Sequence, residues 1–201
     1  MMWTIDLKNV PFEADVRELL MAFYPGGADV TVSANADEST YCFDVSFGSD
    51  GEKSSFSCSR SDDRFDEKCE VKRGLYQVLS SHEGKTLPWG TLTGIRPTKL
   101  AMQGIDFKKV FLTSDEKIKL CFETAAREQK VLEKTDPENG WSLYVGIPFC
   151  PTRCLYCSFT AYPVSLWRDK KSEYIDALIR EIEAVSKMMR GKKLQTVYMG
   201  G

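Results

Sequence analysis

Residues 141–157 read WSLYVGIPFCPTRCLYC, and this stretch decides how the C-terminal part of the chain is interpreted. Its first part, Trp141 to Phe149, is an apolar run typical of a strand. Cys150, Cys154 and Cys157 follow directly. Each of the four irons of a [4Fe–4S] cluster needs a ligand besides its sulfides, and three thiolates on one loop can bind three of them. The spacing therefore predicts a cluster whose fourth iron stays open to chelate the amino and carboxylate groups of a substrate.

Structural zinc is the main alternative for these cysteines. Zinc takes four ligands, commonly from CxxC pairs, so Cys121 or the single histidine, His82, would have to supply the fourth. A triad that binds no metal is the simplest alternative. The other cysteines, Cys42, Cys58, Cys69 and Cys121, lie on predicted strands or helix faces and are interpreted as packing residues.

The pattern after the cysteine loop predicts a βαβ unit. Residues 167–190 are amphipathic at helical spacing, and residues 194–199 read as a strand that ends in Gly200-Gly201. Strand, loop, helix and strand place the two strands parallel. A lone βαβ unit cannot cover both faces of its sheet, so we expect the chain to be the N-terminal fragment of a longer protein.

The pattern before residue 138 predicts a small α+β domain. Thr113 and Glu116 fit a capping box at the start of a long helix, and the turn at residues 136–140 is interpreted as a linker. We therefore expect domains over residues 1–138 and 139–201. The expected strands lie near residues 3–7, 30–32, 41–47 and up to 58, and the expected helices over 11–24, 61–81 and 113–134.

Composition narrows the class of protein. The 201 residues carry a net charge of −2, which argues against nucleic acid as a partner. No apolar stretch approaches the roughly 20 residues that span a bilayer, and residues 1–10 lack the features of a signal peptide. Seven cysteines, an odd number, argue against a disulfide framework. We expect a cytoplasmic protein with no membrane span.

The segment from Tyr144 to Phe159 resembles radical S-adenosylmethionine (SAM) proteins of the oxygen-independent coproporphyrinogen III oxidase family. Within that family it is most similar to the coproporphyrinogen dehydrogenase branch. Leu87–Gly90 and Thr93–Lys99 also resemble the N-terminal domain of that branch. The resemblance implies an α/β fold in which the N-terminal α+β domain precedes a partial TIM-type (β/α) barrel, truncated here after the second strand.

The resemblance also implies roles for individual residues. The three cysteines would bind iron, and Tyr144 would lie near the cluster-bound SAM. Tyr156 would pack beside the cofactor, and the backbone of Phe159 would contact adenine. Gly200 and Gly201 resemble the start of a Gly-Gly-Gly-Thr-Pro segment, whose backbone meets the methionine end of SAM because glycine permits close approach. Ordinary packing is the alternative for Tyr144 and Phe159.

Two positions depart from many family members. Gly146 stands where they have a histidine thought to donate a proton, and Phe159 stands where they have a further cysteine. The dehydrogenase branch shares the glycine. The proton donor and the other catalytic residues are therefore unassigned. Arg96 and Lys99 could meet substrate propionates, although such side chains mostly face water.

By resemblance, the protein is an oxidoreductase of heme biosynthesis, and this fragment alone is inactive. A 5′-deoxyadenosyl radical derived from SAM would abstract hydrogen from a propionate of coproporphyrinogen III, and loss of CO2 and an electron would leave a vinyl group. Two rounds would give protoporphyrinogen IX. The implied partners are the porphyrinogen and an electron donor such as flavodoxin or ferredoxin. A radical SAM-like heme chaperone and a radical SAM enzyme with another substrate are the alternatives.

Overall fold

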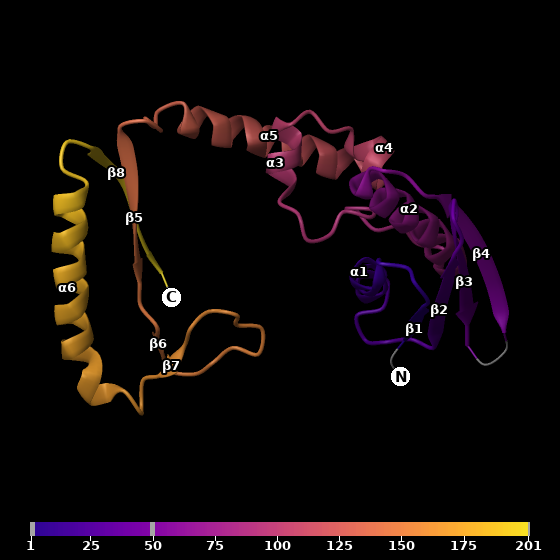
Figure 1. Cartoon of the computed structure of the whole chain (residues 1–201), viewed down its shortest axis with the longest axis horizontal. Helices are drawn as coiled ribbons and strands as arrows, with labels where there is room; N and C mark the ends of the chain where they lie inside the picture. The colour runs from indigo at the N-terminus through magenta and orange to yellow at the C-terminus, as the bar shows by residue number, and fades with distance from the viewer. Residues whose placement is uncertain (1–2, 49–50, 201) are drawn as a thin grey trace. The chain divides into compact units, whose positions relative to one another are not determined.

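The computed structural model describes residues 3–48 and 51–200 of the chain (Figure 1). It is a mixed α/β structure whose chain divides into two compact units, Met1–Glu128 and Gln129–Gly201. The division falls inside helix α5 (Asp115–Leu132), whereas the sequence placed a domain boundary between residues 138 and 139. That boundary stays a prediction.

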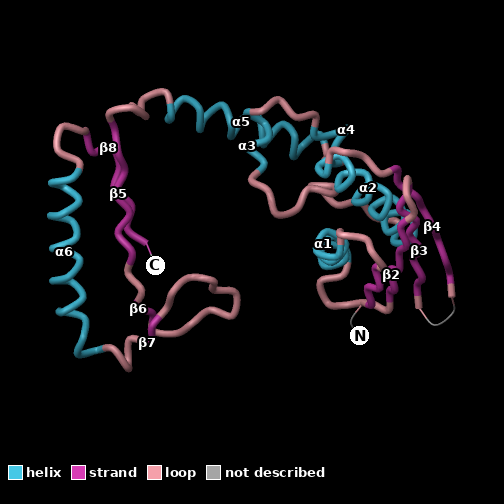
Figure 2. The backbone as a smooth tube through the Cα atoms, in the orientation of Figure 1, coloured by secondary structure: helices cyan, strands magenta, loops and turns pink. Residues whose placement is uncertain are grey.

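The first unit is built on one four-stranded sheet (Figure 2). The strands lie in the order β1-β2-β3-β4, with β1 parallel to β2 and the other neighbours antiparallel. Chain order places helix α1 between the first two strands and helix α2 after the last. Their bounds are β1 (Thr4–Leu7), α1 (Glu13–Phe23), β2 (Val30–Ala36), β3 (Thr40–Phe47), β4 (Glu52–Ser59) and α2 (Arg64–Glu83).

The core of this unit lies between the sheet and the two helices. Leu19 of α1, Leu75 of α2, and Val32 and Val45 of the sheet have no exposed surface. Full burial of such a side chain is worth about 1.5–3 kcal/mol. The opposite face of the sheet carries polar residues such as Asp44. Buried and exposed side chains therefore alternate along the strand, as the sequence pattern predicts for a sheet covered on one face.

A second apolar cluster joins the rest of the first unit. Its buried members include Phe107 and Phe111 of α4 (Phe107–Phe111), Cys121 and Ala125 of α5, and Leu100 and Ala101 of α3 (Pro97–Met102). Helix α4 is too short to show helical periodicity in the sequence, and we did not predict it.

The predicted capping box at the start of α5 is wrong. Thr113 is buried, and its hydroxyl donates to the carbonyl of Trp89 instead of capping the helix. Ser114 caps the first turn, because its Oγ accepts from the amide of Lys117 at 3.4 Å. The cap therefore shifts by one residue, since the buried position takes Thr113 into the core.

A buried lysine anchors the segment that leads into α3. Lys72 of α2 is 4% exposed, its ammonium donates to the hydroxyl of Thr93, and it lies 3.7 Å from a carboxylate oxygen of Glu18. Burial lowers the pKa of Lys72. The hydroxyl of Thr93 also donates to Glu18, so this network ties the 91–99 segment to both α1 and α2.

The second unit is the predicted βαβ arrangement. Strand β5 (Gly140–Gly146) pairs in parallel with β8 (Lys193–Gly200), and the one-turn helix η1 (Arg168–Lys170) leads into α6 (Lys171–Met188) between them. Two short strands, β6 (Phe149–Cys150) and β7 (Tyr162–Pro163), lie at the base of the cysteine loop. Among the residues that the structure describes in this unit, only Val145 is buried.

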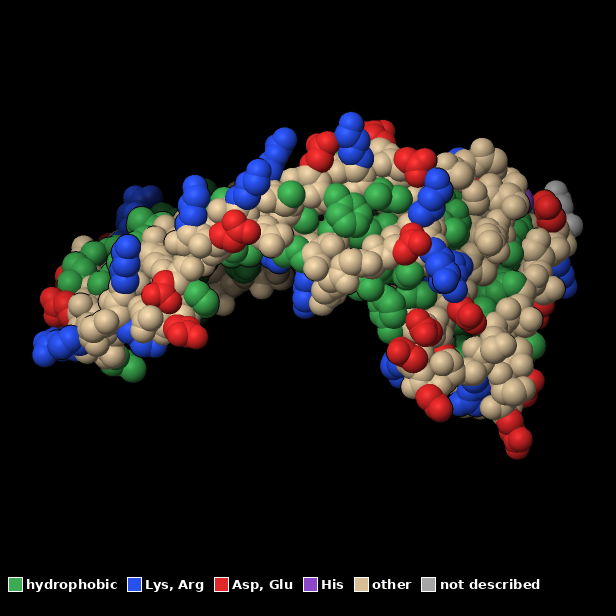
Figure 3. Space-filling view, turned by 90° about the horizontal axis from the view of Figure 1, so that it is seen from above, with side chains coloured by type: hydrophobic (Ala, Val, Ile, Leu, Met, Phe, Trp, Pro, Cys, Tyr) green, Lys and Arg blue, Asp and Glu red, His purple; other side chains and the backbone are tan. Residues whose placement is uncertain are grey.

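The surface carries charges of both signs. On the face shown in Figure 3, Lys and Arg side chains lie interspersed with Asp and Glu side chains. This agrees with the net charge of −2. In residues 3–48 and 51–200, no helix combines the length and the apolar character needed to cross a membrane.

Alanine substitutions at two glycines of the first unit distinguish the cost of backbone strain from the cost of steric overlap. Gly90 has φ +57°, and a Cβ there would lie 2.0 Å from the carbonyl oxygen of Phe111. Gly104 has φ +73° with open space around it. We expect Gly104→Ala to lower the free energy of unfolding by about 1 kcal/mol, through strain alone. Gly90→Ala should cost several kcal/mol more, because backbone must move.

Urea denaturation followed by circular dichroism measures both variants. Equal losses of stability in Gly90→Ala and Gly104→Ala would show that the close approach of Gly90 to Phe111 is not a feature of the folded chain.

Candidate functional site

The carboxyl ends of β5 and β8 meet at one edge of their sheet. Tyr144 is opposite Tyr198 and Gly146 opposite Gly200, and the amide of Ile147 donates to the carbonyl of Gly200 at 2.7 Å. The chain passes from this edge directly into the cysteine loop. Ligand sites of parallel α/β sheets collect at this edge, so the strand pair positions the loop where a site is expected.

The cysteine loop is closed at its base by backbone hydrogen bonds. The amide of Tyr162 donates to the carbonyl of Pro148 at 2.7 Å, and the amide of Val164 donates to that of Cys150 at 2.9 Å. Within the loop, the amide of Cys157 donates to the carbonyl of Cys154 at 3.0 Å, which makes a tight turn. Residues 151–161 therefore form a closed loop with two cysteines on it and Cys150 at its base.

The three cysteines line one cavity of about 270 Å³. All three thiols are free, Cys154 is exposed, and Cys150 and Cys157 are partly exposed. Arg153 is the one charged side chain of the cavity wall, and its guanidinium donates to the carbonyl of Cys157 at 3.5 Å. The wall therefore combines three thiols with one positively charged side chain. The wall consists of Cys150, Thr152, Arg153, Cys154, Tyr156, Cys157, Ser158, Phe159, Thr160 and Ala161.

The donor set of the cavity is three thiols, the set that the predicted cluster needs. Among the described residues, no three His, Cys, Asp or Glu side chains are close enough together to hold one metal ion. A cubane cluster assigns each thiolate to a different iron, so its ligands need not converge on one point. The donor set and its exposure therefore fit the cluster that the sequence predicts.

The two residues considered as a fourth zinc ligand, Cys121 and His82, belong to the first unit. Cys121 is 2% exposed in the core of the first unit, where burial raises the pKa of its thiol. His82 stacks on Phe47 at a ring distance of 3.7 Å, and its Nδ1 lies 3.3 Å from a carboxylate oxygen of Glu52. Both residues already have structural partners within their own unit.

Burial agrees with the predicted packing role for Cys58 and Cys69 but not for Cys42. Cys58 and Cys69 are buried, and desolvation raises the pKa of both thiols, to about 11 for Cys58. Cys42 is exposed on β3, away from the packed face of the sheet. Buried, protonated thiols of this kind are poor metal ligands.

The residues expected to contact SAM surround two cavities that share a wall. Tyr156 lines the cysteine cavity, and Tyr144 lines a second cavity of about 260 Å³ with Gly146. Phe159 lines both. Gly200 lies beside Tyr144, because a Cβ at Gly200 would be 3.4 Å from the phenol oxygen. Gly201 lies outside the described residues.

Two further tyrosines at this edge did not emerge from the sequence. Tyr174 of α6 donates its hydroxyl to the carbonyl of Gly146 at 2.5 Å, and its ring meets the edge of Phe149 at 5.2 Å. Tyr198 stacks on Tyr144. The signal for Tyr198 was present, since strand alternation places it on the same face as Gly200. Nothing in the sequence marks Tyr174 as more than a residue of the apolar helix face.

Arg96 and Lys99 are exposed residues of the first unit. Arg96 immediately precedes α3, and Lys99 lies in its last turn. Within the described part of the chain, neither forms an ion pair. Contact between these side chains and substrate propionates stays a prediction.

Comparison with known proteins confirms the resemblance. The chain is 35% identical over 138 residues to the oxygen-independent coproporphyrinogen-III oxidase-like protein HemZ of Bacillus subtilis (strain 168), covering 62% of this chain and 28% of HemZ. It is 31% identical over 116 residues to anaerobilin synthase of Escherichia coli O157:H7, covering 57% of this chain and 24% of the relative. The chain thus spans about a quarter of the length of these relatives.

A shorter match is to the heme chaperone HemW of Mycobacterium tuberculosis (strain CDC 1551 / Oshkosh). It is 35% identical over 66 residues, which cover 32% of this chain and 17% of HemW. The HemZ match is longer than the Gln129–Gly201 unit, so it includes residues of the first unit as well. No protein-family model matches the chain, and no solved structure matches it.

The cavity predicts how the cysteines divide between metal binding and packing. Cys150→Ser, Cys154→Ser and Cys157→Ser should each lower the iron and sulfide bound after anaerobic reconstitution, because each removes the ligand of one iron. Cys42→Ser is the matched control, since this thiol is exposed but lies in the first unit. Metal analysis of the four variants measures the effect. Zinc in place of iron, or iron loss in the Cys42 variant alone, would contradict the assignment.

Proposed function

We propose that the chain is part of a radical SAM enzyme that converts coproporphyrinogen III to protoporphyrinogen IX without oxygen, a step of heme biosynthesis. The observation that carries this proposal is the length of the match to the oxidase-like relative, which includes residues of both units. The cavity lined by the three cysteines supports the proposal, because such a reaction requires a cluster site.

The proposed cluster ligands are Cys150, Cys154 and Cys157. Three thiolates leave the fourth iron without a protein ligand. When bound, the cluster and SAM supply one-electron cleavage of the sulfonium and hence a 5′-deoxyadenosyl radical, so the hard chemistry belongs to the cofactors. Arg153 would offset the negative charge of the thiolates, because its guanidinium lies in the same wall.

The residues of this chain would position SAM. Tyr144 and Phe159 would hold SAM between the two adjoining cavities, and Tyr156 would pack beside it from the cysteine cavity. Gly200, with Gly201 after it, would let the backbone approach the methionine end. Tyr174 holds the carbonyl of Gly146 and so fixes the point where β5 passes into the loop.

We infer that the βαβ unit opens a partial TIM-type barrel. The support is the parallel pairing of β5 and β8 with α6 between them in the chain, together with the loop at their carboxyl edge. A domain boundary between residues 138 and 139 agrees with the turn there, where a carboxylate oxygen of Asp136 accepts from the amides of Glu138 and Asn139. These hydrogen bonds lower the pKa of Asp136.

Two of the relatives suggest alternatives to the proposed activity. The heme chaperone relative matches about a third of this chain, over a shorter stretch than the oxidase-like relative does. Anaerobilin synthase matches a stretch longer than the second unit, which keeps a radical SAM enzyme with another substrate in contention. A cysteine triad defines the cofactor and not the substrate.

The proposed partners follow from the reaction. Each propionate that becomes a vinyl group gives up CO2, a hydrogen atom and an electron, and the cluster needs an electron for each SAM. A porphyrinogen substrate and a donor such as flavodoxin or ferredoxin are therefore proposed, in the cytoplasm and without nucleic acid.

The intact protein, reconstituted without oxygen, tests the proposal. With SAM, a reductant and coproporphyrinogen III, we expect 5′-deoxyadenosine and protoporphyrinogen IX to accumulate together in a ratio of about two to one, measured by mass spectrometry. Cys154→Ser should lower the amounts of both products at least about a hundredfold, because it removes a cluster ligand.

Two outcomes would contradict the proposal. SAM cleavage without a porphyrin product would favour another substrate. Heme binding by a protein that cleaves no SAM would favour the chaperone.

A further inference from the structure

Tyr198 forms a stacked pair with Tyr144 at the carboxyl edge of the strands. The two residues are opposite each other in the β5–β8 register, their ring centroids are 5.6 Å apart, and their ring planes differ by 22°. Aromatic pairs in this geometry attract each other beyond the area they bury. The orientation of the Tyr144 ring therefore depends on Tyr198.

The pair leans toward the end of both strands, over two glycines. A Cβ at Gly200 would lie 2.8 Å from a ring carbon of Tyr198 and 3.4 Å from the phenol oxygen of Tyr144. A Cβ at Gly146 would lie 3.3 Å from a ring carbon of Tyr144. The absence of side chains at Gly146 and Gly200 is what lets both rings lie at this edge, beside the cavity that Tyr144 lines.

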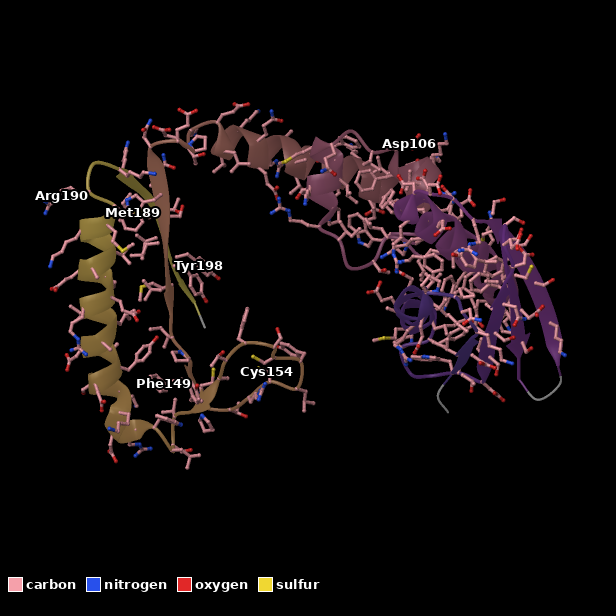
Figure 4. All side chains as sticks on the ribbon, in the orientation of Figure 1. Asp106, Phe149, Cys154, Met189, Arg190 and Tyr198 are labelled. Atoms are coloured by element: carbon pink, nitrogen blue, oxygen red, sulfur yellow. The ribbon has the colours of Figure 1, made fainter. Side chains whose placement is uncertain are left out.

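The pair occupies the strand face that turns away from α6. In Figure 4, Tyr198 and Cys154 lie on the side of β5 opposite the helix. Earlier on the same face, Ser142 accepts a hydrogen bond from Thr196 at 2.7 Å, so the face changes from polar to aromatic toward the loop. Tyr144 is 59% exposed and Tyr198 is 66% exposed. Both rings are therefore open to a ligand on the side of the cysteine loop.

We propose that Tyr198 is a positioning residue for the SAM site, acting through the ring of Tyr144. This inference rests on the proposed function, in which Tyr144 contacts SAM. An exposed tyrosine without a stacking partner has several rotamers, and binding must select one of them. Stacking on Tyr198 favours one rotamer of Tyr144 before SAM binds. Tyr198 thus lowers the entropic cost of SAM binding without being required to touch SAM.

Substitutions at Tyr198 separate this role from a structural one. Tyr198→Leu removes the ring, and we expect the dissociation constant of SAM to rise about 2- to 10-fold, the range of an aromatic pair. Tyr198→Phe keeps the ring and should bind SAM like the unaltered protein. Thr196→Val is the matched control, because Thr196 lies on the same face two residues earlier and outside the stack. The intact, reconstituted protein is titrated with SAM, and the change in the electron paramagnetic resonance signal of the reduced cluster is followed.

A double substitution tests whether Tyr198 acts through Tyr144. Tyr144→Leu with Tyr198→Leu should bind SAM as weakly as Tyr144→Leu alone, since the second change removes the support of a ring that is already gone. Additive losses would overturn the proposal, and so would an unchanged dissociation constant in Tyr198→Leu. Lost iron or a lowered melting temperature in Tyr198→Leu would assign it a structural role and also overturn the proposal.

A readout without cofactors distinguishes failure of this inference from failure of the proposed function. In metal-free protein, nitration of Tyr144 by tetranitromethane, mapped by mass spectrometry, should be faster in Tyr198→Leu than in Tyr198→Phe. Equal nitration rates in the two variants would rule out the positioning role, whatever the result of the SAM titration. Faster nitration in a protein that never binds SAM would show that the stack exists while the proposed function, and the role in SAM binding with it, fails.

Discussion

The parallel pairing of β5 with β8 is the constraint on which the candidate site depends. Its register places Tyr144 opposite Tyr198 and Gly146 opposite Gly200. It also brings the chain from β5 to the cysteine loop at the edge where β8 ends, and the amide of Ile147 continues the ladder past the last pair. A shift of β5 by one residue would turn Tyr144 to the face of α6 and the apolar residues of β5 to the face of the loop. The apolar alternation of Leu143 and Val145 opposes that shift.

The side chains of the cysteine loop are accessible from solvent. Cys154 is exposed and Tyr156 is 90% exposed, whereas Cys58, Cys69 and Cys121 are buried. Desolvation raises the pKa of the three buried thiols, whereas the cysteines of the loop line a cavity together with Arg153. Short backbone hydrogen bonds at the base fix the start and end of the loop. The chain thus separates cysteines that pack from cysteines that can bind metal.

Much of the fold follows from the sequence, because periodicity reports burial directly. The strands and main helices of the first unit and the βαβ order of the second were predicted within a few residues. Helix α4 was missed because five residues show no period, and Thr113 was mistaken for a cap because a cap and a buried hydroxyl look alike in sequence. The cysteines of the site are visible from spacing alone. Tyr174 and the Tyr144–Tyr198 stack required the packing of α6 and the strand register, which no local pattern contains.

Three cysteines are proposed to hold a four-iron cluster, with one iron left for SAM. Mössbauer spectroscopy of the intact protein reconstituted with 57Fe tests it most directly. We predict that SAM changes the isomer shift of one iron in four and leaves the other three unchanged, because only the iron without a protein ligand can bind it. A spectrum in which all four irons stay equivalent after SAM is added would contradict the account.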